Sequence, residues 1–145
     1  MLKNRKAKGR KGDNIIKNLF KKYLGFDVCI FSAASLSPID MVICDKYFTF
    51  LIQNKFSKVW PPDEEEYILS EIADKLIDNA KIKVISCRID SVQKRISYEN
   101  RTYVRMYKCI NKSKNFSILI YEEFKFMEFI DLVHKWHINQ DSKSL

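Results

Sequence analysis

Three polar side chains interrupt two neighbouring apolar segments of the chain. Asp40 lies near the start of segment 39–44, and Gln53 and Lys55 lie near the end of segment 47–56. A turn between the segments would pair them as an antiparallel hairpin, with Asp40 opposite Gln53 or the residue before it. Because side chains alternate between the faces of a strand, Gln53 and Lys55 project to the same face, about 6–7 Å apart. An acid, an amide and an amine in one place can bind a cation and orient a water molecule.

The spacing of these groups resembles that of the PD-(D/E)xK nuclease superfamily. The matching stretches are Pro38-Ile39-Asp40 and Gln53-Asn54-Lys55. Within the superfamily the chain is most similar to archaeal Holliday-junction resolvases. Those enzymes share the opening Arg10-Lys11-Gly12 before a first helix and a serine-containing loop before the aspartate, here residues 32–35. The resemblance covers roughly residues 10–58.

Two positions depart from the pattern of the family. The second motif carries Gln53 where the family has an acid, and Ile16 stands where the family has a glutamate on its first helix. Asp13 lies one turn from Ile16, but we interpret it as the N-cap of that helix. These departures leave open a descendant that binds DNA without cleaving it.

The resemblance implies a metal-dependent endonuclease that hydrolyses DNA phosphodiester bonds, in branched, Holliday-junction-like DNA. Asp40, Gln53 and Lys55 would be the catalytic residues, with Lys55 orienting the attacking water or stabilising developing charge. The cofactor would be Mg²⁺ or Mn²⁺, held by the carboxylate of Asp40, the side-chain oxygen of Gln53 and the backbone carbonyl of Asn54. We expect no organic cofactor.

Two other functions fit the same residues. One is a site-specific, homing-type endonuclease of the same fold, in which a basic insertion would read the sequence. The other is the catalytically lapsed, DNA-binding relative. Enzymes of this type usually act as dimers, so we expect a homodimer.

The charge of the chain favours a polyanionic partner such as DNA, because its 145 residues carry a formal net charge of +8. Residues 1–12 hold six basic residues and no acid, which is typical of a flexible arm that neutralises phosphates. On a predicted strand at 102–110, Tyr103, Arg105 and Tyr107 share one face, where they could stack on bases or form an ordinary exposed surface. The expected nucleic-acid contacts are Lys8, Arg10, Lys11, Ser32, Ser35, Tyr103, Arg105 and Tyr107.

The order of the predicted elements indicates one α/β domain, with a central mixed β-sheet flanked by helices. The resemblance specifies a restriction-endonuclease-like fold. We expect a flexible arm at 1–12, the nuclease-like domain at 13–138 with a basic insertion at about 90–116, and a frayed tail at 139–145. The expected helices are 13–24, 62–77 and 122–137, and the expected strands are 26–31, 39–44, 47–56, 82–89, 102–110 and 116–121.

The cysteines and the hydropathy pattern point to a reducing, cytoplasmic location. The four cysteines are widely spaced and form no Cys-x-x-Cys pair, so we expect reduced thiols rather than a zinc site or disulfides. No apolar run reaches the roughly 18 residues that cross a bilayer. We therefore expect no membrane partner, and the basic N-terminus lacks the apolar core of a secretory signal.

Overall fold

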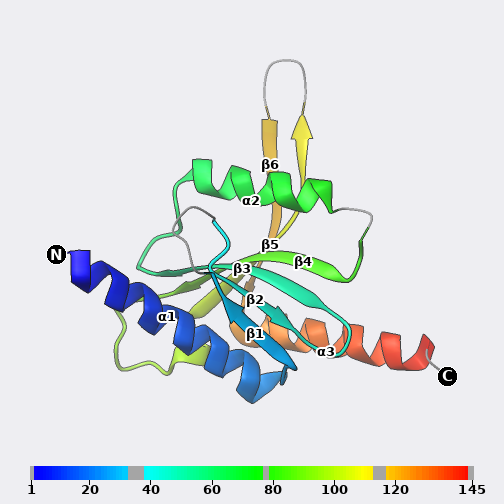
Figure 1. Cartoon of the computed structure of the whole chain (residues 1–145), viewed down its shortest axis with the longest axis horizontal. Helices are drawn as coiled ribbons and strands as arrows, with labels where there is room; N and C mark the ends of the chain where they lie inside the picture. Colours follow the sequence, from blue (N-terminus) through cyan, green and yellow to red (C-terminus); the bar gives the residue numbers. More distant parts are fainter. Residues whose placement is uncertain (1, 33–37, 77–78, 113–116, 144–145) are drawn as a thin grey trace.

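The structure, a computed structural model, describes residues 2–32, 38–76, 79–112 and 117–143. Six strands form one mixed sheet, and three helices pack on it (Figure 1). The predicted α/β class and the mixed sheet flanked by helices are confirmed. The elements are α1 (Leu2–Tyr23), β1 (Val28–Phe31), β2 (Met41–Cys44), β3 (Thr49–Phe56), α2 (Asp63–Lys75), β4 (Ile82–Ile89), η1 (Tyr98–Asn100), β5 (Thr102–Lys112), β6 (Ser117–Lys125) and α3 (Phe126–Lys143).

The strands lie in the sheet in the same order as in the sequence. Every neighbouring pair is antiparallel except β3 and β4, which run parallel. A parallel pair needs a long crossover connection, and α2 provides it. The first half of the fold is therefore a helix, a three-strand antiparallel meander, a crossover helix and a parallel strand.

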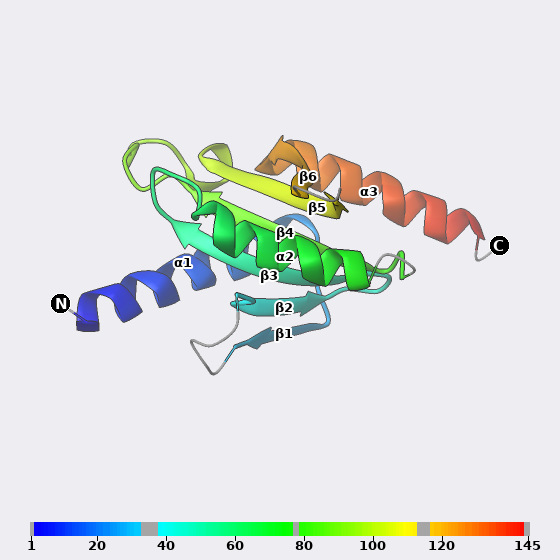
Figure 2. The same ribbon diagram turned by 90° about the horizontal axis from the view of Figure 1, so that it is seen from above.

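The helices cover both faces of the sheet. Helices α1 and α3 lie on one face, and α2 lies on the other (Figure 2). On the first face the ring of Phe20 in α1 packs against Phe50 of β3 and Phe126 of α3, with ring centroids 5.6 and 5.9 Å apart. On the other face α2 buries Leu69 and Ala73 against the strands. Burial on both faces explains the nearly continuous apolar sequence of the central strands.

Helix α1 begins at Leu2, so the expected N-cap is wrong. Asp13 lies inside the helix, and residues 2–12, where we expected an arm, are helical. Lysine, arginine and alanine are good helix formers, which lets the helix extend without an apolar face. Gly25 ends this region as expected, with φ +74°. Gly12 lets the helix approach β3 closely, since a Cβ there would lie 3.0 Å from Asn54 Nδ2.

Strand β5, in the region at about 90–116, pairs with both β4 and β6 inside the sheet. Thr102 and Val104 are fully buried. Strand β6 continues to Lys125, so the residues expected to begin the last helix belong to a strand. Helix α3 then runs on to Lys143 and includes most of the expected frayed tail.

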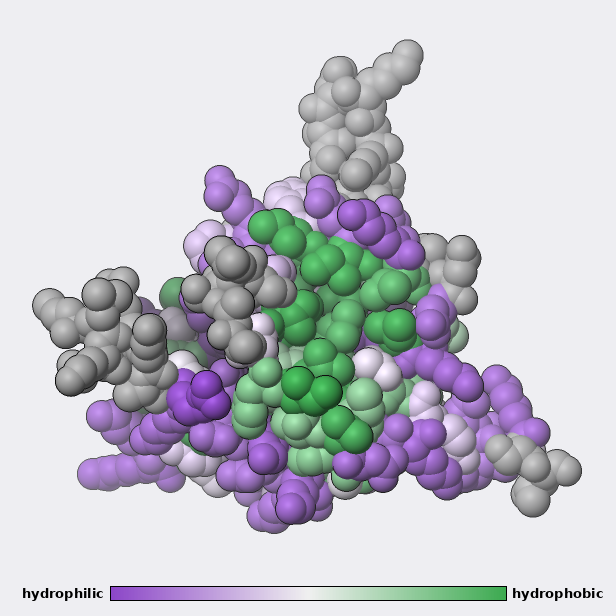
Figure 3. All heavy atoms as spheres, in the orientation of Figure 1, coloured by the Kyte–Doolittle hydropathy of each residue, from purple (hydrophilic) through white to green (hydrophobic). Residues whose placement is uncertain are grey.

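A hydrophobic area is exposed on one side of the molecule. Val28 and Ile30 of β1 and Ile68 of α2 are 45%, 59% and 47% exposed. Figure 3 shows hydrophobic side chains running from α2 across the sheet to β1. Among the described residues, no helix has both the length and the apolar character needed to span a membrane.

Candidate active site

The hairpin of β2 and β3 brings Asp40 and Gln53 together, as the sequence predicts. The register pairs Met41 with Ile52, and the backbone N–H of Asp40 donates to the carbonyl of Ile52 at 2.8 Å. The Asp40 carboxylate accepts from the N–H of Asn54, so Asp40 lies beside residues 52–54 of β3. The Asp45 carboxylate fixes the turn between the strands by accepting hydrogen bonds from two backbone N–H groups, at 2.8 and 2.7 Å.

Asp40 is the central acid of this site. Its Oδ2 accepts a hydrogen bond from the backbone N–H of Asn54 at 2.7 Å. The pKa of Asp40 is raised to about 6, first by burial and then by the nearby carboxylates of Asp13 and Glu65, against the lowering effects of the Asn54 N–H and Lys55. A buried carboxylate among other acids lacks compensating positive charge. A bound cation would supply that charge.

Gln53 is 6% exposed and presents one unsatisfied oxygen. Its Nε2 donates to Glu65 Oε2 at 3.4 Å. Its Oε1 is buried with no hydrogen-bond donor among the described residues. Glu65 belongs to the acidic run 63–66 at the start of α2, and acids at that end of a helix are ordinarily explained by the helix dipole. The hydrogen bond from Gln53 shows that one of these acids, Glu65, belongs to the site.

A second unexpected acid comes from α1. Asn54 Nδ2 donates to Asp13 Oδ1 at 3.4 Å, and burial raises the pKa of Asp13. Ile16, the position of the glutamate in the resembling family, is fully buried in the core. The carboxylate that α1 brings to this end of the sheet is thus that of Asp13, three residues earlier. A residue expected only as a cap has a place in the site.

The remaining expected residues lie around this centre. Lys55 is exposed and shares a face with Gln53, and its charge lowers the pKa of Asp40. The backbone N–H of Ser32 donates to the carbonyl of Asp40 at 2.8 Å, which puts that serine beside the site. Ser35 and the side chain of Lys8 lie outside the described residues.

The oxygen atoms at the site suit Mg²⁺ or Mn²⁺. In the part of the chain that the structure describes, no three His, Cys, Asp or Glu side chains are grouped to hold a metal. The site offers instead one central carboxylate, on Asp40, and the neutral Oε1 of Gln53, which lacks a donor. Mg²⁺ accepts such a set, because it uses few carboxylates and keeps several waters.

The expected exposed row of Tyr103, Arg105 and Tyr107 is wrong, because α2 covers this part of the sheet. Tyr107 is 4% exposed and belongs to the core beneath α2. Arg105 is ion-paired with Glu66 through Nη1 and with Glu123 through Nε. Its guanidinium carbon also lies 4.1 Å from the centre of the Trp60 ring system. Of the three, Tyr103 stays half-exposed.

Arg10 and Lys11, the other expected contacts, are exposed on α1. The guanidinium carbon of Arg10 lies 5.3 Å from the ring centre of Phe31. Lys11 Nζ lies 6.0 Å from that of Phe56. Both cations therefore lie on the α1 side of the sheet, at the end where Asp40 lies. Both remain exposed to solvent.

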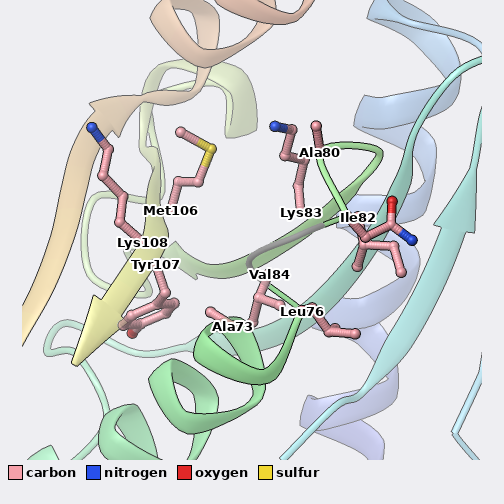
Figure 4. A pocket seen from close by; sticks show the side chains of 10 residues that line it. Ala73, Leu76, Ala80, Ile82, Lys83, Val84, Met106, Tyr107 and Lys108 are labelled. Carbon is pink, nitrogen blue, oxygen red and sulfur yellow. The ribbon is translucent and has the colours of Figure 1, made fainter.

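A hollow of about 330 Å³ lies beside the last turns of α2, between α2, β4 and β5 (Figure 4). It sits toward the start of β4, whereas Asp40 and Gln53 meet near the end of β3. Its walls include Leu76, Val84 and Tyr107. Lys83 also lines it, but Lys83 Nζ lies 4.6 Å from the Trp136 ring of α3, on the other face of the sheet. The hollow contains no acid, so the chemistry belongs to the site at Asp40.

Comparisons of the chain with protein-family models, with curated proteins and with solved structures found no match.

Proposed function

We propose that this chain is a metal-dependent endonuclease that hydrolyses DNA phosphodiester bonds at Asp40, Gln53 and Lys55. The observation that carries the proposal is the buried Oε1 of Gln53, which has no hydrogen-bond donor among the described residues. Gln53 precedes Asn54, whose N–H holds the buried carboxylate of Asp40. A divalent cation is the partner that satisfies both groups at once. The order of helix, three-strand meander, crossover helix and parallel strand supports a restriction-endonuclease-like fold.

Each residue has a distinct role in this proposal. A bound Mg²⁺ or Mn²⁺ would polarise the phosphoryl oxygen and acidify a water molecule. Asp40 anchors the cation by charge, and the Asn54 N–H holds that carboxylate in place. Glu65 accepts a hydrogen bond from the amide nitrogen of Gln53, which leaves Oε1 available as a neutral metal ligand. The Lys55 ammonium orients the attacking water and stabilises the charge that develops on the phosphate.

The substrate proposed is branched DNA, on the resemblance of residues 10–58 to junction resolvases. A homing-type enzyme would cut linear duplex at one sequence instead. A binding-only protein is the second candidate, and one observation favours it: no group of three potential metal-ligating side chains is found in the described ranges. A site with few acids holds metal weakly, and the cleavage assay decides between these candidates.

We also propose that the protein acts as a homodimer, which lets each protomer cut one strand. The exposed hydrophobic area on β1 and α2 supports this, because contiguous apolar surface often marks an interface. Ile30→Asp would place a charge in the β1 part of that area. Light scattering should then give the mass of a dimer for the wild type and of a monomer for the variant, whereas a wild-type monomer contradicts the dimer.

The decisive experiment incubates the protein with labelled linear, branched and single-stranded DNA in Mg²⁺, Mn²⁺ or EDTA. We expect metal-dependent cleavage, strongest on the branched substrate. Asp40→Asn should abolish it, whereas Asp27→Asn, which makes the same change at an exposed position, should not. Cleavage that survives Asp40→Asn would place the active site elsewhere.

A further inference from the structure

A row of four side chains crosses the sheet next to the candidate active site. The strand registers pair Lys55 of β3 with Arg88 of β4, Arg88 with Tyr103 of β5, and Tyr103 with Lys125 of β6. We call these four residues the basic row. Side chains alternate between the two faces of a strand, and other residues of these strands contact α2. Counting from those residues places all four side chains on the α2 face of the sheet. The row spans three strand spacings, about 14 Å.

Arg88 is held in place at the middle of the basic row. Its guanidinium carbon lies 5.3 Å from the Trp60 ring centre and 4.8 Å from that of Tyr103. Its Nη1 donates to the backbone carbonyls of Ser57 and Lys58, at 3.4 and 3.1 Å. Two flanking rings and two hydrogen bonds orient the planar guanidinium before any ligand arrives, and this pre-organisation reduces the entropy lost on binding.

The cations of the basic row differ from their neighbours in forming no ion pair with any described residue. Arg105 and Lys108 lie on the same strand, β5, and both are ion-paired with glutamates of α2 or β6. Among the residues that the structure describes, no ion pair joins Lys55, Arg88 or Lys125 to a carboxylate. Among the described residues, the charges of Arg88 and Lys125 are therefore not paired with a carboxylate, whereas Lys55 lies close enough to Asp40 to lower its pKa.

We propose that the basic row binds the phosphate backbone of DNA beside the bond to be cut, so that the strand leaves the active site across β4, β5 and β6. This assignment rests on the proposed nuclease function, since Lys55 joins the row to Asp40 and Gln53. Cations without an ion-pair partner release counterions when they bind phosphates, and the half-exposed ring of Tyr103 offers a surface for bases or sugars.

The test measures binding to a fluorescent duplex in EDTA across a series of KCl concentrations. Lys125→Ala and Arg88→Gln should each lower the slope of log affinity against log salt by about 0.9, the value for one lost phosphate contact. Lys108→Ala is the matched control, because it removes the same charge from an exposed side chain that is already paired with Glu122. It should keep the wild-type slope. Lys125 is exposed, so its variant is expected to fold.

The outcomes separate this proposal from the nuclease proposal, because binding in EDTA does not depend on cleavage. Wild-type slopes in Lys125→Ala and in a folded Arg88→Gln would overturn the basic row, even in a protein that cuts DNA. Absence of DNA binding by the wild type would overturn it as well. Reduced slopes in a protein that cuts no DNA under any metal condition would keep the row and refute the nuclease.

Discussion

The side-chain amide of Gln53 hydrogen-bonds to Glu65, with Nε2 and Oε2 3.4 Å apart. This contact joins the β2–β3 hairpin to α2 at the candidate active site. It also explains why an amide suits position 53. A glutamine can donate to the neighbouring carboxylate, whereas a glutamate would bring a further buried charge close to Glu65 and Asp40.

Gln53→Glu should therefore destabilise the protein in EDTA, by about 1–3 kcal/mol, because a donor to Glu65 is lost and a negative charge is buried. Mg²⁺ or Mn²⁺ should restore much of the stability, since a cation compensates the added carboxylate. Urea denaturation with and without metal measures both effects. The double variant Gln53→Glu, Glu65→Gln is the control, because it exchanges the two groups and preserves the net charge. A double variant that is no more stable than the single one would contradict the contact.

Asp40→Asn should stabilise the folded protein relative to the wild type, and by more at neutral pH than at acid pH. The folded-state pKa of Asp40 is raised to about 6, so the folded protein holds a proton that the unfolded chain releases between about pH 4 and 6. Wild-type stability therefore falls as the pH rises through that window, and it reaches its floor above about pH 6. Asparagine does not titrate, so the variant should gain up to about 3 kcal/mol over the wild type across this range.

Urea denaturation in EDTA from pH 4 to 8 tests this pH dependence, with Asp27→Asn as the exposed control. Addition of Mg²⁺ should raise the midpoint of the wild type but leave that of Asp40→Asn unchanged. A pH-independent difference between the two proteins would mean that Asp40 keeps its ordinary pKa.

Arg105→Ala should cost about 3 kcal/mol of stability, because it removes the cation that is ion-paired with the buried carboxylate of Glu66, which is 2% exposed. Glu66→Gln in the same background should recover part of the loss. Chemical denaturation at neutral pH measures both variants. Loss of DNA affinity by a fully stable Arg105→Ala protein would instead support the original expectation of an exposed contact.

Gly12→Ala should destabilise the protein by about 1–3 kcal/mol. The added methyl would lie 3.0 Å from Asn54 Nδ2 and 3.2 Å from Phe56 Cβ, so α1 must shift away from β3. Gly9→Ala is the matched control on the same helix, because nothing lies within 4 Å of a Cβ there. Alanine favours the helix, so this control should be neutral or up to about 1 kcal/mol stabilising. Equal effects of the two changes, seen in thermal melts, would show that the helix does not approach the strand.

The elements set by local patterns were predictable from the sequence. The bounds of β4 and the position of Asp40 beside the later residues of β3 follow from apolar runs and one turn. The errors arose where charges pair over long distances. Arg105 made β5 look exposed, because its partners lie on α2 and β6, far away in the sequence.

The acids of the candidate site illustrate the same difficulty. Asp13 and Glu65 both sit at positions that ordinary helix signals explain, a cap and a dipole. Their role depends on where α1 and α2 dock on the sheet. No periodicity within either helix contains that information, so the sequence predicted the hairpin residues and missed the two acids that surround them.

The parallel pairing of β3 and β4 has a consequence for how the site is assembled during folding. Asp40 and Gln53 meet through a local hairpin, which closes in microseconds, whereas Glu65 arrives only after the longer crossover is complete. The half-built site would then exist before α2 closes over it. Trp60 precedes α2 and stacks on Arg105, so its fluorescence should report this last step in stopped-flow refolding. Its signal should lag behind a probe of hairpin formation, and simultaneous changes would indicate one concerted step.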